Sequence, residues 1–464
     1  MAGEVRAGAP KEEALEALPA SSGEILERQF DVLSRHGLQR LLAPKHPIAS
    51  GLVDHGIGEP LWFERDGWRV FAPRSEHGSA HAETMGEFQL EEGEKAALSY
   101  DRASGAVYVP FDLAAAYQSF TSEGWQVKHA HRRLSTRQLN AFYRVKRFIP
   151  RSLQLRARRL VVRWQGRPEF PSWPLDRSVA RLLRFYAFCL LLAQGKREAP
   201  FRWFWPNGHH AALVLTHDVE TEEGLRLAVD IADLEEELGF RSSFNLGGWY
   251  RIDDGVVREL ENRGFEIGVH GLRHDRSLFS SRESFEGQQP ALRDLAERLD
   301  AVSFRSPATH RVVPWIGELP FDCDCSMPHS DPFEPQPGGC CSLWPFFLGD
   351  VVELPYTMPQ DHTLFTLLGH RTPKLWVEQA ARIEDEYGMI LCVTHPDRGY
   401  LGDSRKRTLY AEFLREVAER RHLWRALPRD ASSWWRARDD GEGEYGVIRI
   451  GEGPDEVVFD PPSA

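Results

Sequence analysis

The sequence lacks the features that mark secreted, membrane-spanning and nucleic-acid-binding proteins. No apolar run approaches the ~20 residues that a transmembrane helix needs, and the longest candidate is Tyr186 to Ala193. The segment from Met1 to Gly23 has no apolar core of a signal peptide. The formal net charge of -12 argues against general binding of nucleic acid. A cytoplasmic location is therefore expected, and 464 residues suit roughly two or three domains.

Cysteine is also scarce, with six residues in the whole chain. Without a secretory signal, disulfide bonds are not expected. Four cysteines lie close together in the sequence, namely Cys323, Cys325, Cys340 and Cys341. Two interpretations stay open for them: four thiolates could form a structural zinc site, or they are ordinary small buried residues.

A buried strand that ends in polar residues is the main feature that is present. It runs from Ala211 to Glu220, and its unbroken apolar run is typical of a parallel strand covered on both faces. Because side chains alternate along a strand, Asp218 and Glu220 should point the same way, and His217 the opposite way. Folds of this kind place their chemistry at strand ends. The alternative is that the acids merely begin the following helix, where they suit its dipole.

Three more apolar strands end in polar side chains. His270 and His274 follow one strand, and a His-x-x-x-His spacing brings two imidazoles to one side of a turn, as ligation of a divalent metal requires. Taken alone, this pair could also be surface polarity. Arg305 ends the next strand, and its guanidinium suits a carboxylate. His395 ends another. Four such ends in one region predict a shared site.

Together these motifs resemble the polysaccharide deacetylases, carbohydrate esterase family four with its NodB-homology domain. The resemblance covers roughly Phe201 to Trp435 and is closest to a branch whose first motif reads His-Asp-Val-Asp. It includes Phe321-Asp-Cys-Asp-Cys-Ser, Glu353-Leu-Pro and His395-Pro-Asp. One departure falls on the first motif, where Glu220 stands in place of the family's second Asp.

The resemblance implies a metal-dependent hydrolase that removes N-acetyl groups from a polysaccharide or glycan intermediate. It assigns the base to Asp218, the acid to His395, the orientation of the base to Arg305, and the ligation of a divalent metal, with zinc favoured, to Glu220, His270 and His274. Two other functions are retained as alternatives: a cyclic-amide hydrolase acting on a small molecule, and a non-catalytic glycan- or lipid-binding protein. The presence of both Asp218 and His395 argues against a binding protein, which needs neither.

The expected architecture is α/β: a distorted (β/α) barrel of the polysaccharide deacetylase type over 201–437, preceded by an α+β domain over 24–200. Alternating strand and helix patterns support the barrel. In the N-terminal domain, Trp62 to Phe71 predicts a hairpin with Asp-Gly at its turn. Residues 1–23 are expected to form a disordered tail, and 438–464 a small β appendage.

Two further regions allow more than one interpretation. A Pro-rich loop at 331–339 lies beside the predicted site, where Asp324, Asp361 and His362 either line a substrate groove or have their polarity satisfied by turns. The segment 128–167 holds thirteen Lys or Arg and no Asp or Glu. It predicts either a solvated helical surface or peripheral contact with an anionic membrane or a sugar phosphate.

Overall fold

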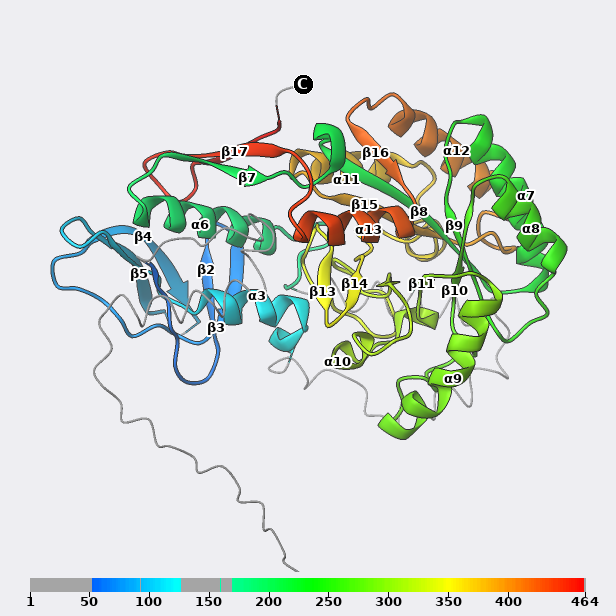
Figure 1. Ribbon diagram of the computed structural model, residues 1–464, viewed down its shortest axis with the longest axis horizontal. Coiled ribbons are helices and arrows are strands. Elements are labelled where there is room, and N and C mark those ends of the chain that lie inside the picture. Colours follow the sequence, from blue (N-terminus) through cyan, green and yellow to red (C-terminus); the bar gives the residue numbers. More distant parts are fainter. Residues whose placement is uncertain (1–51, 92, 127–158, 160–168, 463–464) are drawn as a thin grey trace, which may run out of the picture.

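The computed structural model describes residues 52–91, 93–126, 159 and 169–462. The predicted tail and nearly all of the basic segment 128–167 lie outside these residues. Within them, the chain forms two large sheets, one smaller sheet and the helices that cover them (Figure 1). The fold is therefore mixed α/β.

The first large sheet has six strands in the order β1-β6-β5-β4-β2-β3. Its strands are β1 (Leu52–Val53), β2 (Leu61–Arg65), β3 (Trp68–Ala72), β4 (Glu83–Leu90), β5 (Lys95–Asp101) and β6 (Ala106–Tyr108). The predicted hairpin is confirmed as β2 and β3, with Arg65 opposite Trp68. Its turn residues Asp66 and Gly67 have φ of 46° and 78°, as a two-residue type I′ turn requires.

Two helices, α3 (Leu113–Thr121) and α6 (Ser178–Ala193), pack on this sheet through an aromatic core. The ring of Phe88 meets the rings of Phe111 and Phe185 edge to face, with centroids 5.2 Å and 5.3 Å apart. Such pairs contribute beyond their buried area. The longest apolar run of the sequence, Tyr186 to Ala193, forms the second half of α6.

The second large sheet has nine strands and carries the polar strand ends. Its strands are β8 (Ala211–Val219), β9 (Ser243–Leu246), β10 (Glu266–Val269), β11 (Ser303–Phe304), β12 (Cys323–Asp324), β13 (Phe346–Leu348), β14 (Val351–Glu353), β15 (Met389–Thr394) and β16 (Leu423–Ala426). All pairings are parallel except that of β13 with β14. The fully buried β8 lies against β15 on one side. On its other side it pairs with β16 along its first half and β9 along its second.

The sheet curves toward a closed barrel, but within the described residues no regular ladder of hydrogen bonds joins β14 to β15. Beyond β14, the backbone N–H groups of Thr357 and Met358 both reach the carbonyl of Leu391 in β15, at 3.3 Å and 3.2 Å. These isolated bonds connect the two flanks of the sheet. Because the strands run parallel, their carboxyl ends gather at one edge, where the predicted site residues follow.

Helices cover the outer face of this sheet (Figure 1). They are α7 (Glu222–Glu237), α8 (Asp254–Asn262), α9 (Arg282–Arg298), α10 (Val313–Ile316), α11 (Lys374–Asp385), α12 (Ser404–Ala418) and α13 (Pro428–Asp439). Thr221 caps α7 by accepting from the Gly224 N–H. Ser281 caps α9 and accepts from the Ser284 N–H. Pro290 lies inside the helix rather than before it.

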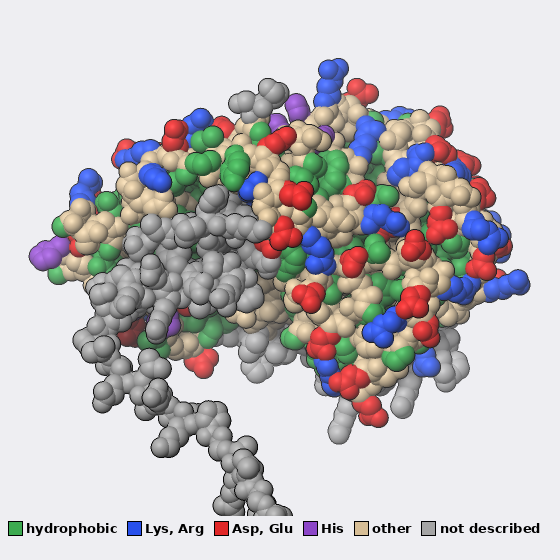
Figure 2. Space-filling model, viewed as in Figure 1, with side chains coloured by type: hydrophobic (Ala, Val, Ile, Leu, Met, Phe, Trp, Pro, Cys, Tyr) green, Lys and Arg blue, Asp and Glu red, His purple; other side chains and the backbone are tan. Residues whose placement is uncertain are grey.

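A third sheet joins β7 (Glu198–Arg202) to β17 (Tyr445–Ile450) and β18 (Val457–Asp460). The aromatic side chains after β7, those of Trp203, Phe204 and Trp205, have no exposed surface and pack in the core. In the described residues, no helix is long and apolar enough to cross a bilayer. Acidic and basic side chains alternate over the face of the second large sheet's helices (Figure 2).

Candidate active site

Asp218 lies at the end of β8 and is held by two groups. Its Oδ1 accepts a hydrogen bond of 2.9 Å from Asn245 Nδ2 in β9, and Arg305 Nε is 3.9 Å from the same oxygen. Burial opposes ionisation, but the interactions with His270, Arg305 and His395 and the Asn245 bond together lower the pKa of Asp218 below its ordinary value. Asp218 is therefore a fixed carboxylate.

Arg305 follows β11 and is completely buried. Its Nη2 donates to Thr216 Oγ1 at 2.9 Å, and its guanidinium lies 5.7 Å from the centre of the Tyr356 ring. Within the described residues, its Nε and Nη1 make no hydrogen bond. Two unsatisfied donors on a buried cation are unusual and indicate that negative charge nearby keeps the guanidinium in place.

Glu220 and the two predicted histidine ligands meet at the same edge. His274 Nε2 is 3.1 Å from Glu220 Oε1, and the rings of His270 and His274 are 6.0 Å apart. His270 Nδ1 donates to the Arg305 carbonyl at 2.9 Å, because a carbonyl can only accept. Burial lowers the pKa of His270 to about 4, so its Nε2 presents a free lone pair.

Glu220, His270 and His274 have the donor atoms of a metal site, but they are not arranged around a common point. Imidazole nitrogens and a carboxylate oxygen are zinc donors, and a ligating histidine usually donates its other N–H to a carbonyl, as His270 does. Over the described part of the chain, however, no three His, Cys, Asp or Glu are grouped so as to hold an ion. Glu220 and His274 instead face each other as a pair.

His395 lies at the end of β15 and is oriented by Asp361. Its Nδ1 donates to Asp361 Oδ1 at 2.7 Å, and its backbone N–H donates to Oδ2 at 3.1 Å. Burial disfavours a charged imidazole, but Asp361 outweighs this effect and raises the pKa of His395 to about 10. Nε2 makes no hydrogen bond to any described residue. His395 is thus a buried proton donor with one open position.

The three residues predicted to line a substrate groove lie in different surroundings. Asp361 is fully buried behind His395. Asp324 is also fully buried and accepts from Ser326 Oγ at 2.6 Å. His362 is half-buried, with its ring 5.7 Å from that of Tyr400, which in turn lies 4.7 Å from the His395 ring. Of the three, His362 alone has a partly exposed side chain beside the site.

Asp397 is a residue that the sequence motif contained but to which no role was assigned. Its carboxylate accepts from the Glu220 N–H at 2.9 Å and from Thr221 Oγ1 at 2.5 Å. It lies so close to Gly224 that a Cβ there would be 2.4 Å from Asp397 Oδ1. Asp397 therefore fixes the backbone that presents Glu220. Asn245 was also missed, although a polar residue near a strand end was a usable signal.

The cysteines are buried and unbonded. All six have free thiols, and burial raises the pKa of Cys340 to about 12. In the described residues, no three of these thiols are grouped with one another, or with His, Asp or Glu, so as to hold an ion. The interpretation as ordinary buried residues is the one that these surroundings favour.

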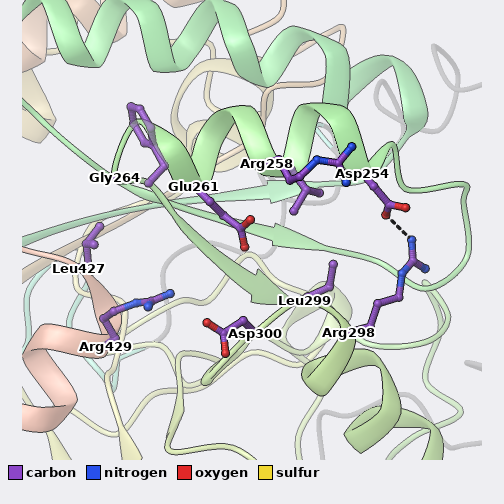
Figure 3. A pocket seen from close by; sticks show the side chains of 11 residues that line it. Asp254, Arg258, Glu261, Gly264, Arg298, Leu299, Asp300, Leu427 and Arg429 are labelled. Atoms are coloured by element: carbon purple, nitrogen blue, oxygen red, sulfur yellow. Dashed lines mark hydrogen bonds and ion pairs between the residues drawn. The ribbon is translucent and has the colours of Figure 1, made fainter.

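A cavity of about 670 Å³ lies at the opposite end of the strands (Figure 3). Phe265 and Asp300, which line it, precede β10 and β11. Two of its charged side chains pair with each other, as Arg298 donates to Asp254 at 2.7 Å. The cavity is therefore separate from the carboxyl edge that holds Asp218 and His395.

No protein-family model and no curated protein matches the sequence. Among solved structures, a protein assigned as a polysaccharide deacetylase from Mycobacterium smegmatis is 19% identical, covering 51% of this chain and 94% of its own, with a TM-score of 0.41. The PuuE allantoinase is 16% identical over 51% of this chain and 93% of its own, with a TM-score of 0.40. A family 4 carbohydrate esterase from Streptomyces lividans in complex with acetate is 10% identical over 48% and 96%, with a TM-score of 0.31.

Proposed function

We propose that the chain is a metal-dependent hydrolase that removes N-acetyl groups from a polysaccharide or glycan intermediate. The observation that carries the proposal is that two buried side chains, Asp218 beside Arg305 and His395 bonded to Asp361, lie at the ends of two paired strands of one sheet. Hydrolysis of an amide needs one group that takes a proton from water and another that protonates the leaving nitrogen. The motifs that resemble the deacetylases contain both residues.

In this proposal Asp218 is the base and His395 the acid. Asn245 and Arg305 hold the Asp218 carboxylate from one side, which leaves its second oxygen to take a proton from water. Asp361 fixes the His395 ring through Nδ1, so that Nε2–H is the group that donates. In this proposal Asp218 is ionised and His395 is protonated before the reaction begins.

The proposed cofactor is one divalent ion, most favourably zinc, held by Glu220, His270 and His274. When bound, such an ion would polarise the scissile carbonyl as a Lewis acid. Asp397 would support it from outside by fixing the Glu220 backbone. The curled sheet, with its irregular connection to β15, supports a distorted (β/α) barrel as the scaffold.

The test combines elemental analysis of the purified protein with an assay of acetate release from N-acetylated glycans, with and without chelator. We expect one divalent ion per chain, acetate release that the chelator abolishes, and loss of the ion in His274→Ala. The matched control is a Cys340→Ser/Cys341→Ser variant, which should keep the ion. An ion that survives His274→Ala and is lost with the cysteines would refute the assignment. If the protein hydrolyses cyclic amides and releases no acetate, its substrate is a cyclic amide and not an N-acetylated glycan.

A further inference from the structure

The segment 305–311, which follows β11, is bonded at its second end to a residue beside the first large sheet. Arg311 Nε donates to Glu123 Oε2 at 2.9 Å, and its Nη2 donates to Glu123 Oε1 at 2.5 Å. Glu123 lies two residues beyond α3, which packs on that sheet (Figure 1). The side chain of Arg311 has no exposed surface and that of Glu123 has 6%. Two parallel bonds fix the orientation of a guanidinium as well as its distance, so this contact is rigid.

The same segment contains two consecutive residues with left-handed backbone conformation. Ala308 and Thr309 have φ of 50° and 52°, and this conformation is rare for a β-branched residue such as Thr309. Such residues persist only where the surrounding structure holds them. Arg311 Nη1 donates to the Thr309 carbonyl at 3.0 Å. The guanidinium that Glu123 orients therefore also holds this left-handed turn.

The left-handed turn directly follows backbone that contacts the proposed site. The Arg305 carbonyl accepts from His270 Nδ1 at 2.9 Å, and Arg305 Nε lies 3.9 Å from Asp218 Oδ1. Pro307, just before the turn, packs against Gly271, because a Cβ on Gly271 would be only 3.0 Å from Pro307 Cδ. A shift of the turn would therefore move both the guanidinium beside Asp218 and the carbonyl that orients His270.

The Pro-rich loop is bonded to the same place. Gln336 Oε1 accepts from the Arg311 N–H at 3.1 Å, and Gln336 Nε2 donates to the Arg311 carbonyl at 2.9 Å. Trp125 Nε1, which also lies beyond α3, donates to the Gly339 carbonyl at 3.2 Å. The residues that follow α3 thus hold both the segment that contains the turn and the loop bonded to it.

We propose that Glu123 and Arg311 are positioning residues that hold the left-handed turn, and through it Arg305 and His270, in place for the reaction. The site at the edge of the second large sheet thus depends on a carboxylate from beyond that sheet. For its effect on turnover this inference rests on the proposed function. The pair differs from a merely structural ion pair in one testable respect: its loss disturbs the turn and kcat, and not only the free energy of unfolding.

The experiment uses the full chain and replaces both members of the pair, as Glu123→Met/Arg311→Met, so that no unpaired charge remains in the interior. The Thr309 carbonyl then loses its donor. We expect kcat to fall roughly tenfold to a hundredfold, because small displacements at a site cause losses of this size, with KM little changed. The matched control is Arg184→Met/Glu386→Met, which removes another ion pair, 2.5 Å long, between α6 and the end of α11. Its kcat should equal that of the wild type.

Amide hydrogen exchange gives a second measurement that does not depend on activity. In Glu123→Met/Arg311→Met the amides of 305–311 should exchange roughly tenfold faster than in the wild type, while those of β8 and those of the control variant keep wild-type rates. If this variant does not fold, Glu123→Asp, which keeps the charge on a shorter side chain, should show a smaller increase in the same amides.

Wild-type kcat in the folded double variant would overturn the inference. Wild-type exchange of the 305–311 amides would also overturn it, whether in that variant or, where it does not fold, in Glu123→Asp. If the wild type releases no acetate, the proposed function fails, while the exchange rates still decide whether the pair holds the turn.

Discussion

Two buried histidine–carboxylate pairs of nearly equal geometry lie in the described part of the chain. His217 Nε2 is 2.9 Å from Glu235 Oε1, and His395 Nδ1 is 2.7 Å from Asp361 Oδ1. His217 lies in β8 and His395 directly follows the neighbouring strand β15, and all four side chains are buried. Residue type, distance and burial therefore do not distinguish them.

The pairs differ in how many of their hydrogen-bonding positions are already used. His217 Nδ1 is bonded to Thr394 Oγ1 at 2.7 Å, and Glu235 also accepts from Tyr410 Oη and Ser242 Oγ, each at 2.5 Å. Both ring nitrogens of His217 and both carboxylate oxygens of Glu235 are therefore engaged. His395 keeps Nε2 open, at the same edge as Asp218. A buried polar pair with no open position stabilises the fold, and one with an open position can act on a substrate.

The largest effect is expected at Asp218, which follows His217 in β8 and shares the open edge with His395. Asp218→Asn keeps the shape and the Asn245 contact but removes the base, so we expect kcat to fall by up to about 10⁴. Metal content should not change, because the proposed ligands are untouched. Acetate release and elemental analysis on the same preparation measure both. Near-normal turnover would remove Asp218 from the mechanism.

His395→Ala should remove the open nitrogen and lower kcat by about 10²–10³. A leaving group that needs no protonation, such as an activated acetyl ester, should restore much of the loss, since the acid is then unnecessary. Kinetics with the two substrates measure this difference. Equal losses with both substrates would mean that His395 supports the site in some other way.

Glu220 could be a metal ligand, or it could serve only as one of the acids at the start of α7. Two substitutions distinguish these roles. Glu220→Ala should lose most of the bound ion and most of the activity, whereas Glu220→Asp should keep measurable amounts of both, since donor type and charge are retained. Calorimetric titration with the metal ion measures the affinity of each variant. Full occupancy in Glu220→Ala would show that the carboxylate serves only the helix.

Asp54 is a buried carboxyl that accepts the Leu113 N–H at 3.3 Å, and it provides a contrast to Asp361. Burial, followed by the charge of Asp112, raises the pKa of Asp54 from 3.8 to about 6. The folded chain therefore binds this proton more tightly than the unfolded chain, so the stabilisation is present below pH 3.8 and is lost as the pH rises toward 6. Asp54→Asn should raise the free energy of unfolding at pH 7 by on the order of 2 kcal/mol. Denaturation at pH 4 and pH 7 should show that gain shrinking at the lower pH.

The smallest effect is expected at the occupied pair. Tyr410→Phe removes one of three donors to Glu235 and should lower the free energy of unfolding by about 1 kcal/mol. The kcat should stay at the wild-type value, because this pair has no open position. Denaturant unfolding and the acetate assay measure the two quantities. A marked loss of kcat would mean that the His217 pair is coupled to the site.

The sequence predicted the elements of the second large sheet better than the contacts between them. The apolar runs that lead to Asp218 and His395 are long, and those before His270 and Arg305, though shorter, also end in a polar residue, so the strands and their shared edge could be predicted. Asp361 could not be assigned to His395, since it lies in a segment without regular periodicity. The pairing of Asp324 with Glu353 depends on strand register across 29 positions, and a sequence alone does not fix register.

The small sheet of β7, β17 and β18 determines where the chain could be cut to give a fragment that folds. β7 lies ahead of β8, and its only ladder partner in the described residues is β17, which comes after α13. The two ends of the site-bearing unit are thus fastened to each other, and Arg438 adds bonds to the carbonyls of Arg202 and Trp203. A fragment cut before Tyr445 would expose an unpaired strand edge. The smallest piece that unfolds as one cooperative body is expected to run from β7 through β18.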